Sequence, residues 1–282
     1  MPELPEVEHL RRTLLPQIVG AHVQSVLLRR SDILQHPHSG KKCSPETALL
    51  VNGVIASVLR KGKNLAIIVN DGRVLGVHLG MSGQVRVGPA AENPKIEKHE
   101  HCEWLLKQGR TRRRMIFKDP RRFGGLCSYP TFDALEQEKW NFLGPDALTV
   151  TGSLLHDRCC DSMRPIKAAL LDQNVLAGVG NIYADEALFR SRINPRKQAR
   201  RISISSYDLL ARAIVAVLTE AIDSGGSTVR SYLDANGNVG DFVKRHQVYG
   251  RTGLDCVRCG KKLRSAQVAQ RTTVWCVSCQ SE

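Results

Sequence analysis

The first residues of the chain place a nucleophile beside an acid. If Met1 is removed, as is usual before a small residue, the chain begins with the secondary amine of Pro2 next to the carboxylate of Glu3. The reference pKa of an α-amino group is about 7.7–8, so much of it is unprotonated near neutral pH. An unprotonated amine can attack a carbonyl-like carbon and form a Schiff base. The alternative interpretation is an ordinary amphipathic helix with Pro5 in its first turn, whose amino end has no chemical role.

Four cysteines near the C-terminus have the spacing of a metal site. Cys256 and Cys259 form one C-x2-C pair, and Cys276 and Cys279 form a second pair after sixteen intervening residues. Four thiolates at this spacing can close a tetrahedral structural zinc site between two β-turns. The sequence therefore predicts one zinc ion. The other cysteines lack such spacing and are interpreted as small apolar residues.

Basic side chains lie between the two cysteine pairs, at Lys261, Lys262, Arg264 and Arg271. A rigid β-ribbon that carries cations can enter a groove of a nucleic acid. The alternative is a solvated basic loop that only completes the fold.

A central segment has the features of a phosphate-binding site. Lys167–Asp172 is predicted as a short helix, Gly178 and Gly180 allow two tight turns, and Asn181 is predicted as the N-cap of the next helix. Backbone N–H groups at such a helix start suit a phosphate, and Lys167 supplies a nearby cation. The alternative is an ordinary helix pair in which Asn181 is only a cap.

Two glycine-bounded loops follow predicted strands, His78–Gly83 and Asp119–Gly124. Met81 and Phe123 at their tips could fold back on the core. With Arg121 alongside, they could instead be wedges that unstack a duplex and fill a vacated space. Enzymes that act on a base must take it out of the stack.

Composition restricts the partners of the chain. The 282 residues include 41 Lys and Arg against 27 Asp and Glu, which gives a net charge of +14. Such an excess favours a polyanionic partner, either nucleic acid or an anionic membrane surface. We find no apolar run long enough to cross a bilayer and no secretory signal, so we expect a cytoplasmic protein with no membrane partner.

Hydrophobic patterns predict a β-rich first part and a helical second part. Apolar β-branched runs at 65–69 and 74–79 flank a turn sequence, and 101–107 and 113–118 are predicted as a second hairpin. Residues 88–100 are predicted as an exposed loop. Helical periodicity dominates from 150 to 223 and is clearest over 207–222, where Ser205 and Asp208 have the spacing of a capping box.

The chain resembles the bacterial formamidopyrimidine-DNA glycosylase family over essentially its whole length. The resemblance rests on several motifs in the same order, namely Pro2–Glu8, Lys61–Asn64, His78–Gly83, Asp119–Gly124, Gly178–Ala184, Val248–Arg251, Ala269–Arg271 and the four cysteines. It implies an α+β fold with a β-sandwich domain and an opening helix over residues 1–130. A helix-two-turn-helix domain would follow over 131–246 and a β-ribbon zinc finger over 247–282, with a DNA groove between the domains.

The resemblance also implies an enzyme that removes oxidised purines and then cleaves the strand at the abasic site. Pro2 would attack C1′ of the damaged nucleotide, and Glu3 would transfer a proton at the sugar. Lys63 would lie beside the phosphate of the lesion and assist elimination. Arg271 would grip phosphates and aid the second elimination.

Further residues match positions that contact DNA in the family. Lys167, Asn181 and Tyr249 match phosphate contacts, and His99 matches another DNA-contacting position. Met81, Arg121 and Phe123 match the residues that fill the space left by the flipped nucleotide, with Arg121 facing the orphaned cytosine. The implied partner is damaged double-stranded DNA, bound by a monomer.

Two features bear on specificity. The opening motif and a long loop between about 226 and 245, which would cover the lesion, favour the purine-specific branch over the pyrimidine-specific, endonuclease VIII-type branch. The basic run Arg110–Arg114 departs from the family pattern and is assigned only extra phosphate attraction.

A non-catalytic zinc-ribbon DNA-binding protein is the remaining alternative, but pure binding requires neither Pro2 nor Glu3.

Overall fold

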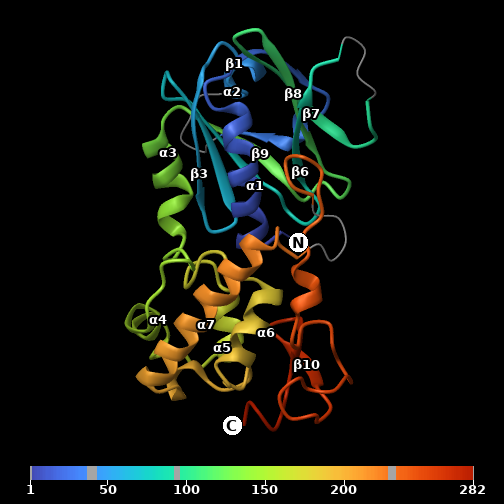
Figure 1. Ribbon diagram of the computed structural model, residues 1–282. Helices are drawn as coiled ribbons and strands as arrows, with labels where there is room; N and C mark the ends of the chain where they lie inside the picture. Colours follow the sequence, from blue (N-terminus) through green and yellow to red (C-terminus); the bar gives the residue numbers. More distant parts are fainter. Residues whose placement is uncertain (1, 37–42, 92–95, 228–232, 282) are drawn as a thin grey trace. The chain divides into compact units, whose positions relative to one another are not determined.

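The computed structural model describes residues 2–36, 43–91, 96–227 and 233–281 (Figure 1). Two compact units are present, Met1–Phe142 with Gly225–Gly240, and Leu143–Ser224 with Asp241–Glu282. A segment from the second half of the chain therefore packs with the first unit. The predicted domain boundaries at 130 and 246 stay predictions.

The first unit contains two β-sheets, one with the strand order β1-β7-β8-β6 and one with the order β2-β9-β5-β4-β3. Inward side chains of both sheets share one hydrophobic core, which includes Trp104 and Phe117 of the first sheet and Ile67 and Leu75 of the second. The strands are β1 (His22–Leu28), β2 (Leu34–Gln35), β3 (Ile55–Lys61), β4 (Asn64–Val69), β5 (Val74–His78), β6 (Gln84–Pro89), β7 (Glu100–Gln108), β8 (Thr111–Lys118) and β9 (Gly125–Tyr129).

Both predicted hairpins are confirmed. Strands β4 and β5 pair antiparallel around a turn in which Gly72 has φ +90°, and β7 and β8 pair antiparallel around Gly109 with φ +58°. Glycine is favoured at both turns because this left-handed conformation is unfavourable for residues with a Cβ atom. The predicted loop at 88–100 is shorter at both ends, since β6 continues to Pro89 and β7 begins at Glu100, and its residues 92–95 lie outside the described part.

Helix α1 (Leu4–Ile18) runs alongside the strands of the first unit and packs against β3, β4 and β6 (Figure 1). Pro5 lies in its first turn, where its missing N–H costs no hydrogen bond. Leu10 and Leu14 are fully buried, so the predicted amphipathic helix is confirmed. Shorter helices in this unit are α2 (Pro45–Ala48), α3 (Phe132–Glu138) and the 3-10 turns η1 (Ser31–Ile33) and η2 (Trp140–Phe142).

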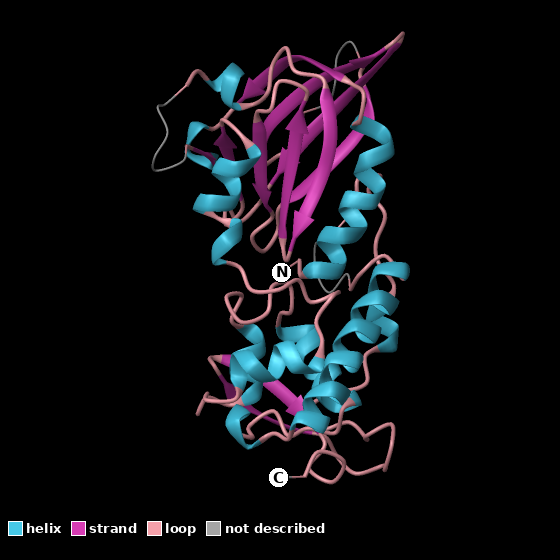
Figure 2. Ribbon diagram, turned by 90° about the vertical axis from the view of Figure 1, so that its left-hand side faces the viewer, coloured by secondary structure: helices cyan, strands magenta, loops and turns pink. Residues whose placement is uncertain are grey.

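Helices predominate in the second unit, as Figure 2 shows in cyan. The longest is α7, whose apolar stripe packs against α4 and α6. The helices are α4 (Gly152–Cys159), α5 (Ile166–Leu171), α6 (Asn181–Arg190) and α7 (Ile204–Asp223), with 3-10 turns η3 (Ala199–Arg201) and η4 (Phe242–Arg245). Strands β10 (Arg264–Val268) and β11 (Arg271–Trp275) form an antiparallel ribbon.

Two predicted helix caps are wrong. The N-cap of α7 is Ser203, whose hydroxyl accepts a hydrogen bond from the Ser206 amide, because the helix begins a turn earlier than its apolar stripe suggests. The N-cap of α6 is Gly180, and Asn181 is the first helical residue. Its side chain donates a hydrogen bond to the Thr272 carbonyl, 3.2 Å away, and therefore joins α6 to β11.

The α+β fold class is confirmed, with sheets in the first unit, a helical second unit and a cysteine-bearing ribbon. Among the helices of the described residues, none has the length and apolar character to span a membrane.

Candidate active site and metal cluster

The amino end of the chain is fixed by hydrogen bonds rather than frayed. Pro2 and Glu3 are buried, and Glu3 is the N-cap of α1. The Glu3 amide donates to Oε2 of Glu6 at 2.8 Å, and the Val7 amide donates to the Glu3 carbonyl at 3.1 Å. Glu6 thus closes a capping box at this end, which fixes the backbone beside the predicted nucleophile. Met1 lies outside the described residues, so its removal stays a prediction.

The same Glu6 carboxylate also binds the segment that returns from the second half of the chain. Its Oε1 accepts a hydrogen bond from the Ser227 amide at 2.6 Å. Gly226 has φ +85°, and a Cβ atom there would lie 2.8 Å from Oε1 of Glu6. Glycine is therefore required both by the backbone conformation and by the close approach of the carboxylate.

The described part of the predicted lesion-covering loop is anchored on the first unit up to Gly240. The Asp234 carboxylate accepts from the Asn236 and Asn238 amides at 2.9 and 2.8 Å and lies 3.5 Å from His9 of α1. The Val87 amide of β6 donates to the Ala235 carbonyl at 3.0 Å. Residues 228–232 lie outside the described part, so the predicted covering of the lesion stays untested.

A charge cluster that the sequence analysis missed supports the turn containing Lys63. Glu8 is buried in α1 and accepts hydrogen bonds from Arg11, Arg12 and Arg60, with the Arg60 contact at 2.9 Å. Burial alone would raise the pKa of Glu8, but these three guanidinium groups outweigh burial and lower the pKa to about 2.

Arg60 connects this cluster to the predicted catalytic lysine. Its Nη1 donates to the Gly62 carbonyl at 3.0 Å, within the tight turn between β3 and β4. Lys63 follows in that turn and is 9 % exposed. Burial lowers the pKa of His78 on β5, and the positive charges of Lys139 and Lys63 add to this shift. The ammonium of Lys63 therefore acts on the neighbouring strand end.

The two glycine-bounded loops are held together by one buried carboxylate. Asp119 is fully buried and accepts hydrogen bonds from the Ser82 hydroxyl at 2.5 Å and the Gly124 amide at 2.7 Å. A Cβ atom on Gly80 would lie 2.3 Å from the Phe123 carbonyl carbon, so the loops are in backbone contact. The Asp119 amide donates to the His99 carbonyl at 3.1 Å, which adds His99 to the same corner.

The apolar tips of these loops are exposed rather than folded back on the core. Met81 is 37 % exposed and Phe123 is 56 % exposed. The Arg121 guanidinium lies 4.9 Å from the centre of the Phe123 ring, a cation–π arrangement that orients both side chains. The structure thus brings Met81, His99, Arg121 and Phe123 together at one end of the first unit.

A cavity of about 310 Å³ adjoins this corner of the first unit, between the β4-β5-β9 strands and the α3–η2 segment. Its walls include Asn64, His78, Tyr129 and Trp140. Of the predicted site residues, only Phe123 lines it. The cavity is therefore not the predicted active site.

Lys167 lies in the interior of the second unit. It is 0 % exposed, and its Nζ is 2.7 Å from the Asp185 carboxylate and 2.8 Å from the Thr273 hydroxyl. Burial raises the pKa of Asp185, and the Lys167 ammonium opposes that shift. The prediction that Lys167 contacts phosphate directly is untested, but this geometry favours an indirect role in which it joins α5 and α6 to β11.

In the second unit, a buried carboxylate positions Tyr249 and a tight turn positions Arg271. The buried Glu186 carboxylate of α6 accepts hydrogen bonds from the Gln247, Val248 and Tyr249 amides, at 2.8 Å for Tyr249. Arg271 is exposed at the tip of the β10–β11 ribbon, where Ala269 and Gln270 both have positive φ and make a tight turn. The role of Glu186 was not found from the sequence.

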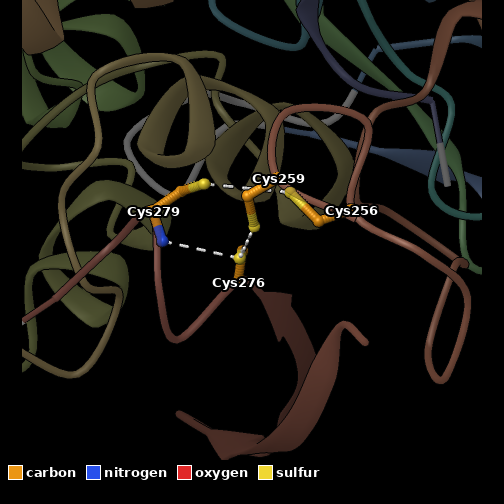
Figure 3. A group of neighbouring side chains, drawn as sticks. All are labelled: Cys256, Cys259, Cys276 and Cys279. Carbon is orange, nitrogen blue, oxygen red and sulfur yellow. Dashed lines mark hydrogen bonds between the residues drawn. The ribbon is translucent and has the colours of Figure 1, made fainter. Parts of the chain in front are cut away.

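Cys256, Cys259, Cys276 and Cys279 converge in the second unit (Figure 3). Their four sulfur atoms lie within 4.8 Å of one another, with Sγ–Sγ distances of 3.9 Å for Cys256–Cys279 and 3.5 Å for Cys259–Cys276. A tetrahedral ion with metal–sulfur bonds of about 2.3 Å places its sulfurs roughly 3.8 Å apart, so the cluster has the dimensions to hold a metal ion.

The cluster is further supported by its surroundings. The Arg258 and Cys279 amides each donate to a cysteine sulfur at 3.5 Å. These contacts fix the positions of the Cys256 and Cys276 sulfur atoms. Gln280 accepts from the Cys276 amide and donates to the Ile193 carbonyl, which fixes the second cysteine pair to the helical part of the unit.

The β-rich first unit has a held amino end, and the helical second unit carries a four-cysteine ribbon, which defines a two-unit α+β class of protein. Comparison with known proteins makes the assignment specific. Residues 1–126 match the formamidopyrimidine-DNA glycosylase N-terminal domain, and residues 143–232 match the formamidopyrimidine-DNA glycosylase H2TH domain. The chain belongs to the formamidopyrimidine-DNA glycosylase family.

Individual relatives match over the whole chain. The formamidopyrimidine-DNA glycosylase of Xanthomonas campestris pv. campestris (strain 8004) is 41% identical over 99% of this chain and 100% of its own length. The crystal structure of the MutM (Fpg) protein of Thermus thermophilus is 39% identical, with a TM-score of 0.85 over 100% of this chain and 99% of its own. The Lactococcus lactis Fpg mutant G226P, solved with DNA containing Fapy-dG, is 33% identical, with a TM-score of 0.87 and full coverage of both chains.

Proposed function

We propose that the protein is a bifunctional DNA glycosylase and abasic-site lyase of base excision repair that removes oxidised purines from duplex DNA. The observation that carries the proposal is the amino end held by Glu6, because a frayed terminus would not place a nucleophile reproducibly. Relatives of full-length similarity are named formamidopyrimidine-DNA glycosylase, and one is solved with DNA that contains Fapy-dG.

Pro2 is the proposed nucleophile. Its nitrogen lone pair forms a bond to C1′ of the damaged nucleotide while the glycosidic bond breaks, and the electron pair of that bond leaves with the base, which takes up a proton. The Pro2 nitrogen, cationic after the attack, loses its N–H proton and regains a lone pair. Glu3 donates a proton to the ring oxygen of the sugar, so the ring opens and the linkage becomes an iminium. Loss of a proton from C2′ then expels the 3′ phosphate, and a second elimination expels the 5′ phosphate.

Lys63 and Arg271 are proposed to assist these eliminations by stabilising the departing phosphates. The β3–β4 turn, supported by Arg60, holds Lys63. The exposed tip of the β10–β11 ribbon carries Arg271. Both side chains supply positive charge where negative charge develops on oxygen, which is the most effective use of a fixed cation in catalysis.

The remaining predicted residues are proposed to serve DNA binding, all directly except Lys167. Met81, Arg121 and Phe123 fill the space left by the extruded nucleotide, which their exposure supports. Tyr249 contacts a phosphate of the DNA, and His99 contacts the DNA at another position. Asn181 contributes through the start of α6, while Lys167 supports β11 from the interior.

We further infer that the four cysteines hold one zinc ion. All-thiolate sites of this spacing prefer zinc, and the closed set of four leaves no open position for catalysis. When bound, the ion would supply a structural link between the two cysteine pairs and so stabilise the ribbon that carries Arg271.

Excision assays on three duplexes test the proposed substrate class. The duplexes carry 8-oxoguanine opposite cytosine, dihydrouracil opposite guanine, or no lesion. We expect base release and strand cleavage on the first duplex, far slower cleavage on the second and none on the third. Equal or faster cleavage of the dihydrouracil duplex would assign the enzyme to the pyrimidine-specific branch. Binding of all three without cleavage would favour the non-catalytic alternative.

A further inference from the structure

The basic run Arg110–Arg114 is divided into two groups by its contacts. Arg113 donates to the Gln17 carbonyl at 3.2 Å, and Arg114 pairs with Glu100 and Glu103. These two arginines are therefore part of the framework of the first unit. Arg110 and Arg112 lie at or beside the tip of the β7–β8 hairpin and are exposed.

A third cation joins the two exposed arginines. Lys107 of β7 is exposed and lies directly opposite Arg112 of β8, and on its other side it lies opposite His22 of β1. Because Leu106 is buried, the alternation of a strand directs Lys107 and its partners to the outer face of the sheet. Lys107, Arg110 and Arg112 are called the hairpin cations below.

The contacts within the described residues give the hairpin cations no ion pair that would explain them as part of the framework of the first unit. Among the residues that the structure describes, no carboxylate lies within ion-pairing distance of any of the three. Like charges directly opposite each other on a sheet are destabilising. Lys107 and Arg112 lie opposite each other with no compensating acid among the described residues, so an anion from outside the unit would relieve their repulsion.

The hairpin cations are remote from the loops proposed to enter the DNA at the lesion. Arg112 is near the start of β8 and Asp119 directly follows its end. Seven residues of strand at about 3.4 Å each separate them by roughly 24 Å along the sheet. A phosphate bound by the hairpin cations is therefore not one that the Asp119–Gly124 loop can contact at the same time.

We propose that the hairpin cations form a second, sequence-independent binding site for the phosphate backbone of a DNA duplex. This site lets the protein hold a second segment while the first is still bound, and so pass directly between segments. The inference rests on the proposed function only in that DNA is the polyanion that the enzyme meets. A two-stranded ribbon tipped with cations has the width to approach a major groove.

The composition of the tip favours DNA over a membrane surface. Gln108, Gly109 and Thr111 separate the cations, so residues 107–112 contain no apolar side chain that could enter the lipid layer. Three cations without a hydrophobic anchor are typical of contacts to phosphates.

The test uses the full-length protein and a triple variant, K107Q/R110Q/R112Q. Protein bound to a labelled undamaged duplex is mixed with increasing unlabelled duplex, and the rate of release is recorded. For the wild type we expect the rate to rise linearly with competitor concentration, because the second duplex binds before the first leaves. For the variant we expect this slope to fall about tenfold, as loss of three phosphate contacts implies.

A matched control removes three exposed cations of the second unit, as R192Q/R200Q/R212Q, and lowers the net charge equally. Its slope should remain near the wild-type value. An unchanged slope in the hairpin variant, or an equal fall in both variants, would overturn the proposal. Tighter binding of a polyglutamate peptide than of duplex DNA at the hairpin would also overturn it, in favour of an acidic protein partner.

Excision of 8-oxoguanine from a short duplex separates this inference from the proposed function. The hairpin variant should excise at the wild-type rate in single turnover, since it retains all proposed catalytic residues. If neither protein excises but the slopes differ as expected, the proposed function fails and the second DNA site stands.

Discussion

Glu8 is the residue whose charge state most affects the framework around the catalytic lysine. Its carboxylate is 7% exposed and binds three guanidinium groups, including the nearly buried Arg60. The lowered pKa of about 2, against an ordinary 4.5, means that the folded state favours ionised Glu8. This stabilisation is fully present above pH 4.5 and is lost as the pH falls towards 2.

We therefore expect Glu8→Gln to lower the free energy of unfolding by about 2–3 kcal/mol at pH 7. The difference from wild type should shrink as the pH falls from 4.5 to 2, because Glu8 then becomes neutral in both states. Urea unfolding at several pH values measures this. Glu46→Gln is the control, since Glu46 is exposed. A difference that is constant with pH would contradict the account.

Gly226 and Gly237 offer a matched pair for testing the contact between Glu6 and the returning segment. Both have φ near +85°, but only Gly226 has the Glu6 carboxylate within contact distance. Alanine at either site incurs the backbone strain, whereas Gly226→Ala also displaces Glu6 at an added cost of about 1–3 kcal/mol. We expect Gly226→Ala to slow excision strongly and Gly237→Ala to leave it near wild type. Equal effects on rate and stability would exclude a special role for Glu6.

At the scale of elements, the buried pair Lys167–Asp185 joins α5, α6 and β11. We predict that Lys167→Met destabilises the second unit by about 3 kcal/mol or more, since it leaves Asp185 buried without its partner. If Lys167 contacted a phosphate directly, its replacement would instead reduce the slope of log affinity against log salt concentration by about 0.9. Affinity measured against salt, together with thermal unfolding, separates the two. A reduced slope with unchanged stability in Lys167→Met would contradict the indirect role and support a direct phosphate contact.

The metal-binding ribbon gives a second prediction at this scale. Chelation should release one zinc ion and weaken DNA binding, because the β10–β11 ribbon then loses the link that holds Arg271 in place. Cys256→Ser should reproduce this loss. Cys43→Ser should not, because Cys43 lies outside the four-cysteine cluster. Metal content and affinity are measured on the same samples, and unchanged affinity after verified metal loss would contradict the prediction.

These elements also show how far sequence reasoning reaches. The hairpin around Gly72, the stripe of α7 and the cysteine spacing are local signals, and the structure confirms the two elements and the convergence of the four sulfurs. The roles of Glu6, Glu8 and Glu186 depend on partners far away in the chain, at Ser227, Arg60 and Val248. No local pattern encodes such pairings. The burial of Lys167 was missed for the same reason, because its partners Asp185 and Thr273 come together only in the folded unit.

At the scale of the whole molecule, segments that are far apart in the sequence together hold the amino end of the chain in place. Gly225–Gly240 leaves the second half of the sequence to pack with the first unit, where Ser227 meets Glu6. Family membership covers both units. The central claim is that this arrangement serves covalent chemistry at Pro2, and it can be tested directly.

Borohydride trapping tests this claim most directly. The protein is incubated with a duplex containing 8-oxoguanine opposite cytosine, and reductant is added. We predict a covalent protein–DNA adduct whose linkage maps by mass spectrometry to the Pro2 nitrogen. The adduct should be absent from Pro2→Gly and from protein with a residue retained ahead of Pro2, while both still bind the duplex. An adduct that forms equally well in these two proteins, or binding by the wild type with no adduct and no cleavage, would contradict the account.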